Sequence, residues 1–193
     1  MISKKIINNT SLYTITGFIP FVTSFLTVPI YTRYLSPTDY GYMALISVFS
    51  TILIPFFGLE LNASISRYYF SYEDNKRKVF ISTILLSVIF QLIILFFIFY
   101  FLGENLFSTV FPNVIIDYRS IIMLSIVAAM FKRVSNIGRV ILLAEEKGYF
   151  ILFRSILSIT LTICLGIYFV AYLKKGIFGA VIGSAISGFI VMI

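Results

Sequence analysis

The sequence contains no histidine, no tryptophan and a single cysteine, Cys164. An intramolecular disulfide therefore cannot form, and a zinc or haem site built from histidine and cysteine ligands is excluded. Only 12% of the 193 residues are charged, whereas about a quarter are charged in a typical soluble domain. So few charges cannot cover a water-facing surface of this size, which excludes a soluble globular enzyme.

Acidic residues are also scarce. The eight carboxylates are scattered along the chain, except for the neighbours Glu73–Asp74 and Glu145–Glu146, which lie beside basic residues. Such pairs are typical of solvated helix ends. The chain has neither a glycine-rich phosphate loop nor the turn motif that carries a nucleophilic serine. We therefore expect no catalytic activity, no cofactor and no metal site.

Long uncharged runs make up most of the sequence. Hydrophobic residues make up 60% of the chain. A helix of about 20 apolar residues crosses a hydrocarbon core of about 30 Å, and five runs are close to that length: Ile6–Thr32, Tyr40–Leu59, Val79–Gly103, Ser155–Leu173 and Gly176–Ile193. The runs do not alternate between polar and apolar residues, so strands of a membrane barrel are excluded.

A sixth span is less obvious, because only Ser120–Phe131 is uncharged between the third and fourth long runs. The helix becomes long enough if it continues through Lys132, Arg133 and Arg139. A five-span chain with a buried amphipathic segment here is the alternative. We favour an all-α, polytopic membrane helix bundle of six transmembrane helices in one domain. The predicted spans are approximately 10–31, 41–60 (with an extension to 70 left open), 79–102, 119–144, 150–173 and 176–193.

The distribution of basic residues predicts the orientation. With the N-terminus in the cytoplasm, seven lysines and arginines fall in cytoplasmic loops and four in outer loops. Positive residues favour the cytoplasmic side. We therefore expect a multi-pass protein of a cytoplasmic membrane with its N-terminus inside.

The basic residues within the fourth predicted span are unusual for a membrane helix. Each costs roughly 2.5–3.5 kcal/mol at the centre of a lipid-facing helix. A set of small and polar residues recurs every three or four positions and so shares one helix face: Ser125, Ala128 or Ala129, Lys132, Ser135 or Asn136, and Arg139. A small and polar face of this kind is expected to line a wet cavity or a helix contact.

Two further cations extend this group. Arg154 lies about one turn into the fifth span, and Arg67 follows Glu60 and Ser64 at helical spacing after the second. For Arg154 a snorkelling side chain is the alternative, and for Arg67 an anchor at the cytoplasmic face. Phosphate or pyrophosphate is the natural ligand of such a cluster. A lipid-linked phosphate fits best, because its tail can stay in the bilayer. Nucleic acid does not fit, since the basic residues occupy no exposed hydrophilic face.

A family resemblance rests on four segments in order. The first is TVPIYTRYLSPTDYG at Thr27–Gly41. The others are Gly58 to Tyr68, LLAEEK at Leu142–Lys147, and KGIFGA at Lys175–Ala180 followed by Gly183. Together they resemble polysaccharide flippases of the O-antigen and teichoic acid type, within the multidrug/oligosaccharidyl-lipid/polysaccharide exporter superfamily. The resemblance covers nearly the whole chain.

The resemblance implies a function. Such flippases move lipid-linked oligosaccharides, usually on undecaprenyl pyrophosphate, to the outer leaflet by alternating access of two six-helix lobes around a cationic cavity. An Na⁺ or H⁺ gradient and polysaccharide polymerase or assembly proteins are further expectations. By this resemblance the chain looks like the N-terminal lobe alone, truncated at its C-terminus; a half-size protein that dimerises is the alternative. The candidate substrate-binding residues are Arg67, Lys132, Arg133, Asn136, Arg139 and Arg154.

Three alternatives remain at this stage. A multidrug or small-solute exporter of the same fold is expected to carry acidic rather than basic residues inside the bundle. A non-transporting scaffold of a polysaccharide-assembly complex is a hypothesis from another class. A membrane glycosyltransferase is not favoured, because no carboxylate pair is placed at a membrane surface.

Overall fold

A computed structural model describes residues 4–53, 61–112, 114 and 116–192. Every regular element in this part of the chain is helical, which confirms the all-α prediction. Pro55, Glu60 and the Gly58–Leu59 portion of the second family segment lie outside the described residues.

Seven α-helices and two π-helical turns follow one another along the described chain. They are α1 (Lys4–Tyr34), α2 (Pro37–Leu53), α3 (Leu61–Tyr68), α4 (Asp74–Val110), η2 (Tyr118–Ile122), α5 (Met123–Ala144), α6 (Gly148–Ile167), η3 (Tyr168–Tyr172) and α7 (Gly176–Met192). Four segments of the described chain are long and apolar enough to span a membrane: Asn9–Tyr34, Asp74–Val110, Tyr118–Ala144 and Gly148–Tyr172. Gly176–Met192 is a shorter apolar helix. The chain is therefore a polytopic membrane helix bundle.

The charged fourth span is one continuous helical segment. η2 leads directly into α5, and the helix continues past Lys132, Arg133 and Arg139 to Ala144. The segment is thus helical over the length that the six-span interpretation requires. That all six predicted ranges cross the bilayer stays a prediction.

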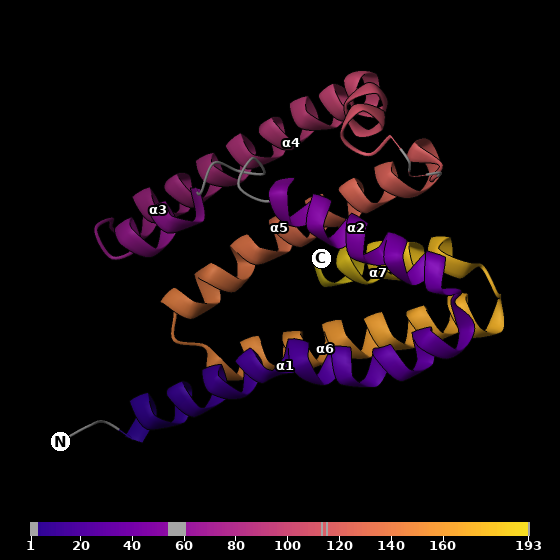
Figure 1. Cartoon of the computed structure of the whole chain (residues 1–193). Coiled ribbons are helices and arrows are strands. Elements are labelled where there is room, and N and C mark those ends of the chain that lie inside the picture. Colours follow the sequence, from indigo (N-terminus) through magenta and orange to yellow (C-terminus); the bar gives the residue numbers. More distant parts are fainter. Residues whose placement is uncertain (1–3, 54–60, 113, 115, 193) are drawn as a thin grey trace.

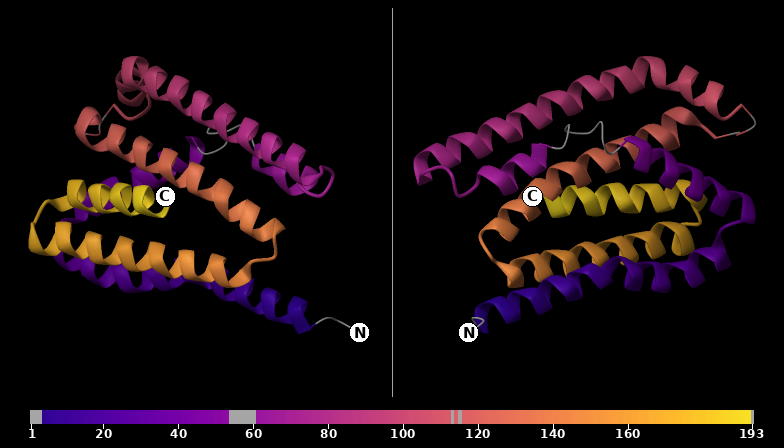
Figure 2. Two further views of the ribbon diagram at one scale, coloured as in Figure 1. Left: turned by 180° about the vertical axis from the view of Figure 1, so that it is seen from behind. Right: turned by 60° about the vertical axis from the view of Figure 1, so that its left-hand side comes forward.

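The helices form layers (Figure 1). α1 and α6 pack side by side at one edge, and α7 packs between α6 and α5. α4 covers the opposite face of α5 together with α3. The views from behind and from the side show the same order (Figure 2). α2 leaves the end of α1 and contacts α5 and α7, so that α1, α2, α5, α6 and α7 surround a common interior.

The α1–α2 connection is fixed by a capping box. The Ser36 hydroxyl accepts a hydrogen bond from the Asp39 backbone N–H at 3.1 Å, and the Asp39 carboxylate accepts one from the Ser36 backbone N–H at 3.3 Å. Pro37 occupies the first helical position, where its missing N–H has no cost. The SPTD sequence in the family segment therefore starts α2 immediately after α1 ends.

Contacts between loops hold the opposite end of the bundle. The Tyr69 hydroxyl donates to the Glu145 carboxylate at 2.9 Å, and the Lys147 ammonium pairs with the same carboxylate at 2.6 Å. These partners, the lysine first, hold the pKa of Glu145 below its ordinary value. The Asn9 side-chain amide donates to the Glu146 carbonyl at 3.0 Å. α1, the α3–α4 connection and the α5–α6 connection thus meet at one end.

Glycines allow α6 and α7 to approach closely. A β-carbon added to Gly183 would lie 3.0 Å from the Gly166 backbone nitrogen. A β-carbon added to Gly166 would lie 2.3 Å from the Tyr31 hydroxyl of α1. Small residues at such positions are typical of membrane helix interfaces, where close packing replaces the hydrophobic effect.

Gly183→Ala should destabilise the bundle, because the added methyl group meets backbone atoms of α6 that cannot move independently. Overpacking of this kind costs about 1–3 kcal/mol. Gly17→Ala is the matched control, since no atom lies within 4 Å of a β-carbon added there. We expect a lower thermal unfolding midpoint in detergent for Gly183→Ala and an unchanged or higher one for Gly17→Ala. Equal midpoints would contradict the α6–α7 packing.

Candidate functional site

The interior of the bundle contains a cavity with two adjoining lobes. The first, which we call the Tyr31 lobe, has a volume of about 560 Å³ and reaches towards the α1–α2 connection. The second, the Arg139 lobe, has a volume of about 720 Å³ and extends towards the start of α6. Residues that line both lobes are Thr23, Ser47, Lys132, Asn136 and Thr162. The shared lining shows that the two lobes adjoin along the bundle.

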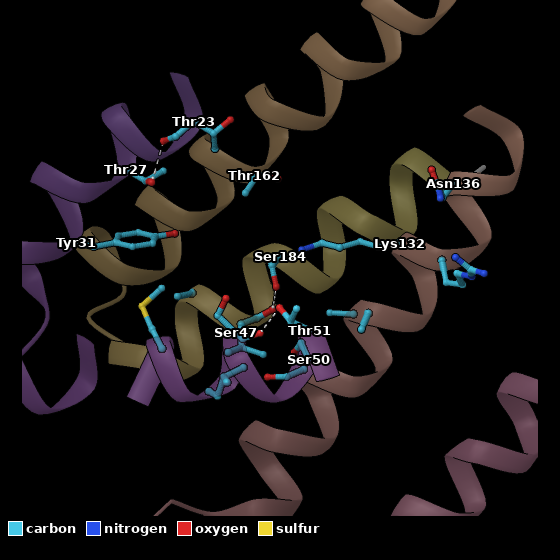
Figure 3. A pocket seen from close by; sticks show the side chains of 18 residues that line it. Thr23, Thr27, Tyr31, Ser47, Ser50, Thr51, Lys132, Asn136, Thr162 and Ser184 are labelled. Atoms are coloured by element: carbon cyan, nitrogen blue, oxygen red, sulfur yellow. Dashed lines mark hydrogen bonds between the residues drawn. The ribbon is translucent and has the colours of Figure 1, made fainter. Parts of the chain in front are cut away.

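The predicted polar face of α5 points into this cavity. Ser125 lines the Tyr31 lobe, Arg139 lines the Arg139 lobe, and Lys132 and Asn136 line both. Figure 3 shows the Lys132 side chain reaching from α5 towards Ser184 of α7. The helical spacing in the sequence therefore placed these residues on the correct face.

Arg154 joins three helices at the Arg139 lobe. Its Nη2 atom donates to the Ser135 hydroxyl of α5 at 2.8 Å and to the Val191 carbonyl of α7 at 2.7 Å. A β-carbon added to Gly138 would lie 2.6 Å from Nη1 of the same guanidinium. The absence of a side chain at Gly138 thus lets Arg154 lie across α5. Arg154 has a structural role as a cross-link between α5, α6 and α7.

Arg133 is the most buried of the cavity cations, with 8% of its surface exposed. It contributes to the wall of the Tyr31 lobe, and its Nε and Nη2 atoms are buried without hydrogen-bond partners. An unpaired guanidinium group in this position is costly. Because both atoms are shielded from solvent, they can meet an anion in the cavity only after the side chain or its neighbours move.

Arg67 lies apart from the other candidate residues. It is exposed near the end of α3, outside the residues that line the cavity. Its guanidinium carbon is 5.5 Å from the centroid of the Tyr68 ring, as in a cation–π contact. The structure thus brings together Lys132, Arg133, Asn136, Arg139 and Arg154, but not Arg67.

The charge of the cavity is of one sign. Four cations line it, and no carboxylate among the described residues does. Described carboxylates that form ion pairs lie near helix ends, as in the pairs Asp74–Arg77 and Glu104–Arg119. The positive charge in the interior is therefore not neutralised by the protein's own side chains within the part described, and the cavity favours an anionic ligand.

The sequence prediction missed the hydroxyl groups on the other walls. Thr16, Thr23 and Thr27 of α1 line the cavity and recur seven and four residues apart. Helical periodicity could have identified this stripe. The serines of α2 and α7 gave a weaker signal, because isolated hydroxyl groups are common in membrane helices and bond to their own backbone.

One comparison with known proteins identifies the family. The family model for polysaccharide biosynthesis proteins, Polysacc_synt, matches residues 6–193. The chain belongs to this family. A search of curated proteins and a search of solved structures each find no match.

Membership confirms that the chain is a polysaccharide biosynthesis protein, as the resemblance implied. The flippase activity and the single-lobe interpretation stay predictions. The chain is a multi-pass membrane protein of polysaccharide biosynthesis. The match covers α1 from residue 6 onward and the other helices of the described bundle in full, including those that surround the cavity. The cationic cavity is thus a feature of a member of a polysaccharide biosynthesis family.

Arg154→Met should reduce stability by about 1–2 kcal/mol, because it removes charged hydrogen bonds that join α5 and α7 to α6 while retaining much of the apolar stem. Arg33→Met is the control, since Arg33 is an exposed cation in the last turn of α1. Unfolding in mixed SDS micelles measures the difference. If both variants lose the same stability, Arg154 is not a cross-link.

Proposed function

We propose that the chain takes part in translocation of a lipid-linked oligosaccharide across the cytoplasmic membrane, and that its cavity binds the pyrophosphate of that lipid. The observation that carries the proposal is the cavity lined by Lys132, Arg133, Arg139 and Arg154 without a carboxylate among the described residues. Membership in a polysaccharide biosynthesis family gives the class of substrate.

The donors of the cavity match phosphate chemistry. Lysine and arginine form short, charge-assisted hydrogen bonds with phosphate oxygens, and arginine can donate two at once. Lys132 contacts both lobes of the cavity, so its ammonium group can follow a phosphate that moves between them. Pairing with the ligand offsets the cost of holding these cations within a membrane bundle.

The isoprenoid tail has no need to enter the cavity. The outer surface of the bundle is apolar: Phe21 and Phe25 of α1 and Phe90 of α4 are each more than 60% exposed. The tail can therefore remain in the bilayer while the head group lies between the helices. Translocation would require the cavity to be accessible first from one side of the membrane and then from the other. We propose that this chain supplies one lobe of a two-lobe transporter.

The orientation, ion coupling and partner proteins in this proposal rest on the sequence and its family resemblance. We propose that the N-terminus lies in the cytoplasm, because basic residues are in excess in the loops that would then be cytoplasmic. Na⁺ or H⁺ coupling and contact with polymerase or assembly proteins belong to the same proposal. A small-solute exporter is less favoured, because the cavity lining contains cations rather than acids among the described residues. A non-transporting scaffold predicts that loss of the gene does not cause a lipid-linked intermediate to accumulate.

Lys132→Met and Arg139→Met should each reduce translocation of lipid-linked oligosaccharide into everted membrane vesicles by roughly tenfold or more. The estimate corresponds to loss of one hydrogen bond to a charged group, about 1.5–3 kcal/mol. Lys76→Met is the control, because Lys76 is exposed in the first turn of α4, away from the cavity. Normal translocation by both cavity variants, at wild-type protein levels, would contradict a role of these cations in transport.

A further inference from the structure

A second group of cations lies outside the cavity, where α3 meets the start of α4. Figure 1 shows α3 lying beside the first turns of α4. Three cations in this part of the chain are exposed: Arg67, Lys76 and Lys78. None of them forms an ion pair with a carboxylate of the described residues.

The neighbouring carboxylates do not neutralise these cations. Asp74 pairs with Arg77, whose Nη2 atom lies 2.6 Å from the carboxylate. The Arg77 guanidinium carbon also lies 4.8 Å from the centroid of the buried Tyr69 ring, so this cation points towards the interior. Glu73 is exposed and is the one carboxylate of the α3–α4 connection that remains without an ion pair to a described residue. The exposed surface is therefore positive overall.

Aromatic rings connect Arg67 to Lys76. The Arg67 guanidinium carbon is 5.5 Å from the centroid of the Tyr68 ring, and the centroids of the Tyr68 and Phe80 rings are 6.4 Å apart. Tyr72 contacts the same Phe80 ring, with 5.1 Å between the centroids. Phe80 lies four residues after Lys76, on the same side of α4. We call Arg67, Tyr68, Tyr72, Lys76 and Phe80 the Lys76 patch.

Lys76 also begins an exposed apolar stripe of α4. Val79, Thr83, Leu86 and Phe90 follow it at intervals of three or four residues, so they share its side of the helix. Val79, Leu86 and Phe90 are 66–68% exposed. On a membrane-spanning helix such a face contacts acyl chains. The Lys76 patch, with its cations and tyrosine rings, therefore lies where head groups are expected.

The cations and the stripe together select one class of ligand. A phosphate diester accepts charge-assisted hydrogen bonds from lysine and arginine. A soluble anion or an acidic protein would use the cations but not the stripe. A zwitterionic lipid would use the stripe, but its ammonium group is repelled by the cations. A lipid with a net negative head group uses both.

We propose that the Lys76 patch binds an anionic phospholipid, whose head group contacts Arg67 and Lys76 and whose acyl chains lie along Val79, Leu86 and Phe90. The site goes beyond the proposed function and does not depend on it, because none of the residues of the patch lines the cavity. Loss of Lys76 should therefore weaken lipid binding without altering the cavity.

The test compares two lipids that differ only in the head group. Affinities of the delipidated full chain in detergent are measured by native mass spectrometry for phosphatidylglycerol and for phosphatidylcholine with the same acyl chains. The test variant combines Arg67→Gln and Lys76→Gln. The matched control combines Arg33→Gln and Lys175→Gln, which removes one exposed arginine and one exposed lysine near the end of α1 and the start of α7.

We expect the wild-type chain and the control to bind phosphatidylglycerol at least tenfold more tightly than phosphatidylcholine. The test variant should lose most of this preference, because each cation near an anionic head group contributes about fivefold. Equal affinities of the wild-type chain for both lipids would overturn the proposal. An equal loss in the test variant and the control would also overturn it, because net charge alone would then explain binding.

Single substitutions separate a site from diffuse charge. Lys78 is exposed two residues after Lys76, which turns it about 200° round the helix and away from the stripe. Lys76→Gln should weaken binding of phosphatidylglycerol about fivefold, and Lys78→Gln by less than twofold. Equal effects of the two substitutions would contradict a site on the side of α4 that carries the stripe.

Three further arms locate the lipid and test its class. Lys132→Met should leave the affinity for phosphatidylglycerol unchanged, and a loss would place this lipid in the cavity instead of at the Lys76 patch. Glycerol phosphate and a polyglutamate peptide should each bind at least tenfold more weakly than phosphatidylglycerol. Equal affinity for glycerol phosphate would indicate a site for a soluble anion, and equal affinity for the peptide an acidic protein partner. Either result would overturn the proposal.

Discussion

The arrangement of this bundle depends on keeping the positive charges of α5 and α6 away from lipid. Lys132 lies near the middle of α5, where exposure to hydrocarbon would cost roughly 2.5–3.5 kcal/mol. Arg139 and Arg154 lie within two turns of a helix end, where the cost is smaller. No carboxylate among the described cavity residues neutralises them. Hydration in an internal cavity can stabilise these charges instead. The helices α1, α2, α5, α6 and α7 surround such a cavity. The arrangement favours binding of an anion, because the donors are already oriented before the anion enters.

The rest of the fold follows from that interior. The polar face of α5 turns inward, while large apolar side chains such as Phe21 and Phe25 of α1 are exposed on the outer surface. Gly183 and Gly166 bring α7 against α6, which places Ser184 and Ser187 at the cavity. Arg154 bonds across α5 and α7 on one side of this contact. The same cation therefore contributes charge to the cavity and holds its wall together.

Much of this was accessible from the sequence, for identifiable reasons. The periodicity of Ser125, Lys132, Asn136 and Arg139 gave the cavity face of α5, because helical geometry relates spacing directly to direction. The burial of Arg133 and the isolation of Arg67 could not be predicted, since both depend on which helix packs against the residue. The bonds of Arg154 to Ser135 and Val191 are likewise contacts between distant segments. The threonine stripe of α1 could also have been predicted from its helical spacing. Unlike the polar face of α5, however, it contains no charged residue that marks it as unusual in a membrane helix.

The single cysteine offers a direct test that the cationic interior is wet. Cys164 is exposed on α6, so Cys164→Ser gives a background without cysteine. Asn136→Cys then places a thiol in the cavity, and Phe90→Cys places one on the exposed face of α4. Labelling by charged methanethiosulfonate reagents should be fast at position 136, faster with the anionic than the cationic reagent, and negligible at position 90 in membranes. Absence of labelling at position 136, or a preference there for the cationic reagent, would contradict a hydrated, positively charged cavity.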